Sequence, residues 1–281
     1  RVRNNRESLL SGVNATILKS VDGGNSWTKS DNGLKFGPKG RIGLVASKLT
    51  PNLLFSIVIG ENNEWEGFYK SVNGGANWVN LLTNTGSNSL PDNAMGGFGW
   101  YFGKIEINPT NPNEVIVGVT GHLYTKNAER GVYKTTDGGK TWKRTLYINN
   151  QTGASDLVME PGNPDVFYAG MWRVIRTPYS MESGGEGSGL YKSTDGGETW
   201  VPLINKKGMP KGLWGIVGVA VAPSNPEKVY ALVESDTEKE ILYKGFSDQF
   251  EFLNTYLLLN DNSFLIDYIN FRFYSKSLLF S

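Results

Sequence analysis

Short runs of alternating apolar and polar residues recur along the chain, separated by turns rich in Gly, Asn and Pro. Residues 104–107 alternate in this way, an Asn/Pro turn follows at 108–113, and a second apolar run occupies 115–117. The same order of run, turn and run recurs at 157–169 and 219–232. Period-two alternation bounded by such turns is typical of β-strands. Each unit therefore predicts a pair of antiparallel strands.

An eight-residue box of the form Ser/Thr-x-Asp/Asn-Gly-Gly-x-Ser/Thr/Asn-Trp recurs between these units. It occurs four times, at 20–27, 71–78, 135–142 and 193–200, and its tryptophans follow at intervals of 51, 64 and 58 residues. A run ending in Tyr-Lys precedes each of the last three boxes and predicts a third strand, and the segment from each Trp predicts a fourth. Four antiparallel strands per period of this length predict an all-β fold, a β-propeller of four-stranded blades.

The repeat also predicts the domain organisation. Blades span 1–245, with an outer hairpin at 15–31, blades at 40–82, 100–147 and 154–205, and a partial blade at 215–245. We expect an incomplete part of a larger propeller of about 6–10 blades, beginning inside a longer protein because a box starts by Ser20 and no signal peptide precedes it. Residues 246–281 fall outside the pattern, with no Gly or Pro and ten Phe or Tyr. They are either a divergent strand pair or an out-of-frame translation, and we favour the second.

The box has a mechanical explanation that needs no ligand. The two glycines supply the positive φ of a tight turn, and the Asp side chain accepts backbone N–H groups of that turn. Asn73 fits this role, because an amide serves a turn but does not replace a catalytic carboxylate. We expect each box Trp to pack against its own blade. The predicted structural residues are Asp22, Trp27, Asn73, Trp78, Asp137, Trp142, Asp195 and Trp200.

Antiparallel strands return alternately to two faces, so the boxes share a face with the turns between first and second strands. The other face receives the long loops at 60–67, 83–101, 120–131, 171–188 and 205–215, where we expect any ligand-binding function. Aromatic rings there suit sugars, whose C–H faces stack on Trp or Tyr while their hydroxyls take charged hydrogen bonds. The candidate binding residues are Trp65, Trp100, Tyr101, His122, Arg130, Trp172, Arg173, Arg176 and Trp214, and the same loops carry Tyr124 and Tyr179. Trp100 and Trp172 suit the core equally well.

Paired carboxylates hydrolyse glycosidic bonds when they lie roughly 5–10 Å apart. The candidate catalytic residues are Asp92, Glu129, Asp156 and Glu182, with Glu64, Glu66 and Glu186 on the same face. Each carboxylate alone suits a solvated loop charge better than a catalytic role. The single His122 lacks an accompanying Gly-x-Ser-x-Gly motif, which argues against a serine-hydrolase triad. Zinc-like, EF-hand and phosphate-loop spacings are missing as well, so the sequence predicts no metal and no cofactor.

Charge and composition exclude several classes of binding partner. With 28 basic and 27 acidic residues the net charge is +1, so no overall field attracts nucleic acid or anionic lipid. No apolar run reaches the roughly 18 residues that a membrane-spanning helix needs. The chain has no Cys, so it has neither disulfides nor thiolate metal sites.

Four boxes at blade spacing resemble the BNR/Asp-box superfamily of sialidases, sortilin-type propellers and xyloglucan-degrading enzymes. Residues 129–142, 152–159 and 187–193 are most similar to large secreted bacterial proteins with sortilin-like repeats. The resemblance implies a secreted, periplasmic or cell-surface module that binds a glycan or a protein ligand through its long loops. The alternative is a glycoside hydrolase completed by further blades or a second propeller, so enzymatic activity stays open, and a purely structural scaffold is a third possibility. The sialidase arginine motif is missing, and the catalytic residues of the xyloglucan enzymes do not map onto this chain.

Overall fold

The computed structural model describes residues 11–61, 65–81, 90–91 and 104–236, together with the backbone of β1 (Val2–Arg3), β2 (Ser8–Leu9) and β20 (Thr255–Leu257). Every regular element in these residues is a β-strand, so the predicted all-β fold is confirmed. The predictions for Glu64, Asp92, Trp100 and Tyr101, and those for 246–281 apart from β20, lie outside the described residues.

The strands form a series of antiparallel sheets, numbered here as blades. The first blade is a hairpin of β3 (Leu18–Lys19) and β4 (Thr28–Lys29). The second contains β5 (Ile42–Ala46), β6 (Leu54–Ile59), β7 (Trp65–Ser71) and β8 (Val79–Asn80). The third contains β9 (Lys104–Ile107), β10 (Val115–Val119), β11 (Gly131–Thr135) and β12 (Lys143–Leu146). The fourth contains β13 (Thr152–Met159), β14 (Phe167–Arg176), β16 (Gly189–Ser193) and β17 (Val201–Pro202), and β15 (Met181–Ser183) pairs with the end of β14. The fifth contains β18 (Trp214–Val221), β19 (Val229–Ser235) and β20.

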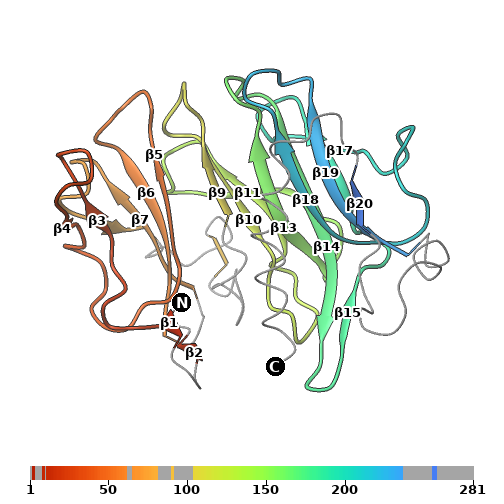
Figure 1. The fold of residues 1–281 in the computed structure, drawn as a ribbon, viewed down its shortest axis with the longest axis horizontal. Helices are drawn as coiled ribbons and strands as arrows, with labels where there is room; N and C mark the ends of the chain where they lie inside the picture. Colours follow the sequence, from red (N-terminus) through yellow and green to blue (C-terminus); the bar gives the residue numbers. More distant parts are fainter. Residues whose placement is uncertain are drawn as a thin grey trace.

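The blades stand side by side in chain order, from β3–β4 at one end to β18–β20 at the other (Figure 1). Their first strands are neighbours, since β5 contacts β9, β9 contacts β13 and β13 contacts β18. Blades that pack face to face with their first strands together surround a common axis, as in a propeller. The predicted propeller, present as an incomplete ring, is confirmed.

The second strands are buried on both faces, because each inner blade lies between two others. In β10, Val115 and Val117 belong to the core shared with the second blade, whereas Ile116 belongs to the core shared with the fourth. A strand covered on both sides needs apolar residues at consecutive positions. This explains the uninterrupted Val-Ile-Val run of β10.

Three of the four box tryptophans, Trp78, Trp142 and Trp200, contact the preceding blade as well as their own, so the expected packing against their own blade is only part of their burial; Trp27 in the first blade is 59% exposed. Trp142 is 5% exposed, and its ring meets Phe68 of the preceding blade edge-on at 5.1 Å between centroids. Trp78 donates from Nε1 to the carbonyl of Ser30, also in the preceding blade, at 2.8 Å. The box turn carries its Trp on the face of the sheet that meets the preceding blade, and there the ring buries the most apolar area.

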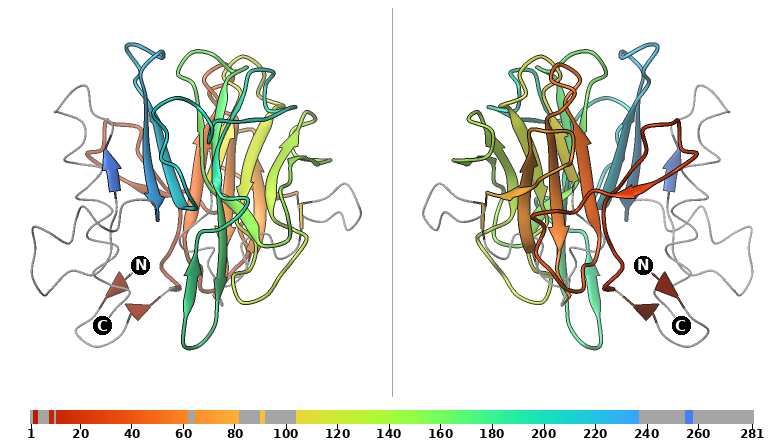
Figure 2. Two further views of the ribbon diagram at one scale, coloured as in Figure 1. Left: turned by 90° about the vertical axis from the view of Figure 1, so that its right-hand side faces the viewer. Right: turned by 90° about the vertical axis from the view of Figure 1, so that its left-hand side faces the viewer.

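Each box contacts the turn between the first two strands of its own blade. The first box glycine donates its N–H to that turn in three blades, Gly74 to Asn52, Gly138 to Asn113 and Gly196 to Asp165, at 2.8–2.9 Å. Boxes and turns therefore share one end of the blades, as the strand order predicts, and we name it the box face. The opposite end, with the described residues of loop 60–67 and with loops 120–131, 171–188 and 205–215, is the loop face. The β14–β15 hairpin projects from the loop face beyond the other blades (Figure 2).

Candidate functional site

The box side chains are engaged in their own turns. A side-chain oxygen of the boxed Asp or Asn accepts the backbone N–H four residues later in all four copies, Asp22 from Ser26, Asn73 from Asn77, Asp137 from Thr141 and Asp195 from Thr199, each at 2.9 Å. Both glycines of every box have φ between 67° and 95°. Hydrogen bonds from Thr199 lower the pKa of Asp195 to about 2, so the carboxylate is ionised at neutral pH.

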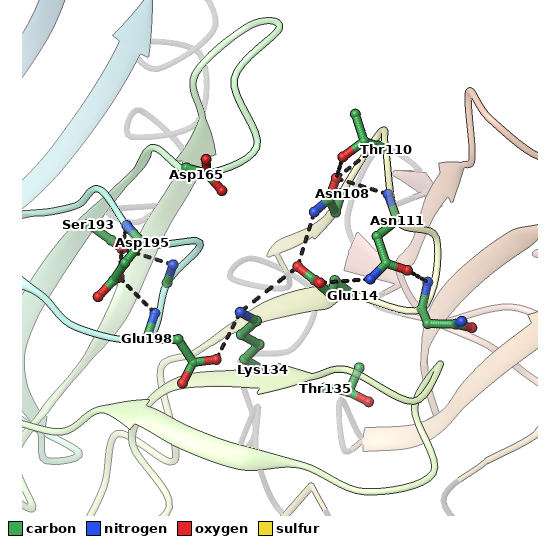
Figure 3. Close-up of polar contacts among 12 residues, drawn as sticks. Asn108, Thr110, Asn111, Glu114, Lys134, Thr135, Asp165, Ser193, Asp195 and Glu198 are labelled. Atoms are coloured by element: carbon green, nitrogen blue, oxygen red, sulfur yellow. Dashed lines mark hydrogen bonds and ion pairs between the residues drawn. The ribbon is translucent and has the colours of Figure 1, made fainter.

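Ion pairs on the box face join the third blade to the fourth (Figure 3). Lys134, which directly precedes the third box, lies 2.9 Å from Glu198 of the fourth box and 3.9 Å from Glu114 of its own blade. Lys143 reaches the other oxygen of Glu198 at 2.9 Å. These charges are satisfied by one another across the blade boundary. The third and fourth boxes therefore serve the packing of blades and offer little to a ligand.

On the loop face, Arg130 is fully buried and ties three segments together. Its guanidinium donates to the carbonyls of His122 at 2.7 Å, Gln151 at 2.5 Å and Val174 at 3.2 Å. Burial lowers the pKa of Arg130 to about 10, and the charge of Arg173 adds to the effect, so the group stays protonated at neutral pH. Arg130 therefore acts as an internal clamp of the loop face.

Arg173 and Trp172 fasten the base of the β14–β15 hairpin. Arg173 donates to Glu182 at 2.9 Å and to the carbonyl of Gly184 at 3.0 Å. The buried Trp172 donates from Nε1 to Ser183 Oγ at 3.0 Å. The hairpin is also joined to the 120–131 loop, because the backbone N–H of Arg176 donates to the carbonyl of Leu123 at 2.8 Å. The 120–131 loop and the β14–β15 hairpin therefore form one connected surface.

Three of the tryptophans predicted to stack on sugars lie among the described residues, and all three are buried. Trp65, Trp172 and Trp214 all lie in hydrophobic cores, and Trp214 also donates to the carbonyl of Pro210 at 3.0 Å. Their rings therefore offer no face to a ligand. In loops 120–131 and 171–188, two tyrosines expose their rings: Tyr179 at the tip of the hairpin is 98% exposed, and Tyr124 is 51% exposed. The partly exposed His122 ring lies 6.5 Å from that of Tyr124.

Asp156 holds neighbouring blades together near the axis. Its side chain is buried at an irregularity in the β13–β14 register, where it lies 3.1 Å from Lys104 of the third blade. It also accepts the backbone N–H groups of Leu157 at 3.1 Å and of Val219, in the fifth blade, at 3.0 Å. Of the other carboxylate candidates, Glu182 is paired with Arg173 and Glu129 is partly buried in the 120–131 loop. The structure thus keeps Asp156 and Glu182 in separate ion pairs and does not join them in one site.

Glu106 on β9 is a charged group that the sequence reasoning missed. Burial raises the pKa of this carboxyl to about 7, opposed by Lys104 and reinforced by Asp156. Strand register shows how it stands out. The position across the blade from the Lys that precedes each box holds Glu106 in the third blade, but Val45 in the second and Val158 in the fourth. A comparison of equivalent positions among the blades would therefore have singled out Glu106 from the sequence.

The fold and the boxes together define part of an Asp-box β-propeller. Residues 133–144 and 191–202 match the family model "BNR/Asp-box repeat", so the chain carries repeats of this family and the resemblance seen in the sequence is confirmed. No curated protein matches the chain.

Several solved structures are similar. The GH74 enzyme of Niastella koreensis is 23% identical, over 79% of this chain and 30% of its own, with a TM-score of 0.50. An ancestral GH74 enzyme is 19% identical over 80% and 25%, with a TM-score of 0.49. YCF48 bound to D1 peptide is 16% identical over 79% and 85%, with a TM-score of 0.33. The chain thus spans 25–30% of these two GH74 enzymes, and at such identities the likeness concerns the fold. Among the described residues, no helix has the length and apolarity to cross a membrane.

Proposed function

We propose that the chain is part of a binding module that recognises a glycan or a protein ligand through its loop face. The observation that carries the proposal is that two exposed tyrosines lie on loops that buried hydrogen bonds and an ion pair hold in place. Tyr179 and Tyr124 present their rings to solvent, while the buried Arg130 and the Arg173–Glu182 pair hold the loops beneath them. Exposed aromatic rings on a fixed scaffold suit both sugar stacking and protein contact, because little side-chain entropy is lost on binding.

The box face gives further support, because its side chains already have partners within the fold. The boxed side chains of all four copies accept hydrogen bonds within their own turns, and Glu198 joins two blades. A secreted or cell-surface location is part of the proposal and comes from the resemblance alone.

Glycoside hydrolysis is the second candidate, and Glu106 is the observation that favours it. A carboxyl with a pKa of about 7 is protonated for half of the molecules at neutral pH, as a general acid requires. Asp156, which raises the pKa of Glu106, would supply the negative charge beside it. Against this role stand the three contacts that already occupy the Asp156 carboxylate.

The test is a screen of the chain against a panel of polysaccharides, oligosaccharides and extracellular proteins, recording binding and the release of reducing sugars together. Binding without sugar release supports the binding module. Release of sugar that Glu106→Gln abolishes, with the fold retained, overturns it in favour of the hydrolase. Neither binding nor release from any member favours a structural scaffold and contradicts both proposals.

A further inference from the structure

A pocket of about 280 Å³ lies on the box face between the first blade and the second box. Lys19 and Lys29 of the first blade line one part of it, and Gly75 and Ala76 of the second box line another. Lys19 donates from Nζ to the carbonyl of Gly74 at 2.9 Å, which holds its ammonium group beside the box. The ammonium group of Lys19 is therefore fixed beside this pocket.

The equivalent boundary, between the third and fourth blades, shows which group can occupy the position beside Lys19. Lys134 precedes the third box as Lys19 precedes the first, and Glu198 follows the glycine pair of the fourth box as Ala76 follows that of the second. There, the Glu198 carboxylate lies 2.9 Å from Lys134. At the first boundary a methyl group stands in place of the carboxylate. In the described residues Lys19 makes no ion pair, although it occupies the position of Lys134.

The remaining polar groups of the pocket have partners of their own. The Asp31 carboxylate accepts the hydroxyl of Thr16 at 2.6 Å, and the Ser30 hydroxyl donates to the carbonyl of Gly75 at 2.7 Å. Two lysines and one aspartate leave the lining with one excess positive charge.

We propose that this pocket binds a carboxylate group of an acidic ligand, in the position that the chain's own Glu198 occupies at the later boundary. The carboxylate would accept a charge-assisted hydrogen bond from Lys19, whose Nζ already lies beside the second box. This site lies on the box face, so it goes beyond the proposed loop-face function and does not depend on it.

The test is a titration of the ¹⁵N-labelled chain with glutarate at constant ionic strength, followed by backbone amide shifts. We expect saturable shifts at Gly75 and Ala76, and none with glutaramide, the neutral analogue. Lys19→Ala should weaken glutarate binding about threefold or more, as loss of one exposed ion pair predicts. Ala76→Glu should abolish it, because the chain then supplies its own carboxylate. Lys48→Ala, which removes an exposed lysine outside the pocket, is the matched control and should leave binding unchanged.

The dispersion of the amide spectrum shows whether each variant is folded, and Lys19→Gln serves as a second variant for the same contact. Three results overturn the proposal. They are an absence of saturable shifts, an equal response to glutaramide, and glutarate binding that survives Ala76→Glu in the folded protein.

Discussion

Replacing Trp142 by Ala tests whether the box tryptophan holds its blade to the preceding one. Trp142 is 5% exposed and packs edge-on against Phe68, whereas Trp27, at the same position of the first box, is 59% exposed. Both rings make the same local bond from Nε1, to Gly139 at 3.1 Å and to Gly24 at 3.0 Å. The two substitutions therefore remove the same turn contact and differ in packing between blades.

Truncation of a buried Trp costs about 3–5 kcal/mol, and the edge-on contact with Phe68 accounts for about 0.5–1.5 kcal/mol of such a loss. Truncation of a largely exposed Trp costs about 1 kcal/mol or less. We therefore expect Trp142→Ala to lower the free energy of unfolding by at least about 2 kcal/mol more than Trp27→Ala. Urea unfolding followed by far-ultraviolet circular dichroism measures both without relying on Trp fluorescence. Equal losses for the two variants, within about 0.5 kcal/mol, would refute the packing argument.

Three further predictions concern charged groups. Asp195→Ala should lower the free energy of unfolding by about 1–2 kcal/mol. Asp195→Asn should lower it by less than about 0.5 kcal/mol, because Asn73 makes the same turn hydrogen bond in the second box. Since the pKa of Asp195 is lowered to about 2, its contribution is present above about pH 4 and is lost as the pH falls toward 2, which unfolding curves at pH 7, 4 and 2 would reveal. For Glu106 the effect of pH on stability is the opposite, because its pKa is raised to about 7. The free energy of unfolding should fall as pH rises from about 4.5 to 7, by at most about 3 kcal/mol. Glu106→Gln should remove this pH dependence. Arg130→Met should remove one donor from each of three carbonyls, of which those of His122 and Gln151 keep a second donor, and should lower the free energy of unfolding by about 1–3 kcal/mol. Faster amide exchange in 120–131 and 171–183 is the local readout, and unchanged exchange there would contradict the clamp.

The sequence predicts the parts of this fold that depend on local geometry. Paired glycines with an Asp or Asn before them define the box turn, and the spacing of the boxes defines the blades. The contacts between blades are harder to predict, because Lys134 and Glu198 are 64 residues apart and meet only when two blades pack.

Burial of the loop residues was only partly predicted from the sequence, which left Trp172 open between core and ligand and placed Trp214 and Arg130 among the binding candidates. Trp172 and Trp214 occur in loop-rich segments, yet both rings turn inward to cores that the loop face itself creates. Arg130 binds only backbone carbonyls, which any sequence supplies, so no partner residue reveals its role. Glu106 was predictable in principle, because the equivalent residues Val45 and Val158 are apolar.

The central claim is that the glycan or protein ligand is recognised on the loop face and that the boxed side chains serve the fold; the carboxylate pocket at the first blade boundary is a separate proposal. The most direct measurement compares three proteins on the same glycan and protein panel: the unmodified chain, Tyr179→Ala combined with Tyr124→Ala, and Trp27→Ala. All three exposed rings are removed at small cost to stability, and only the two tyrosines lie on the loop face. We predict that the double tyrosine variant loses binding to every ligand that the unmodified chain retains, while Trp27→Ala binds as before. Binding that survives the tyrosine changes and is lost with Trp27→Ala would contradict the account.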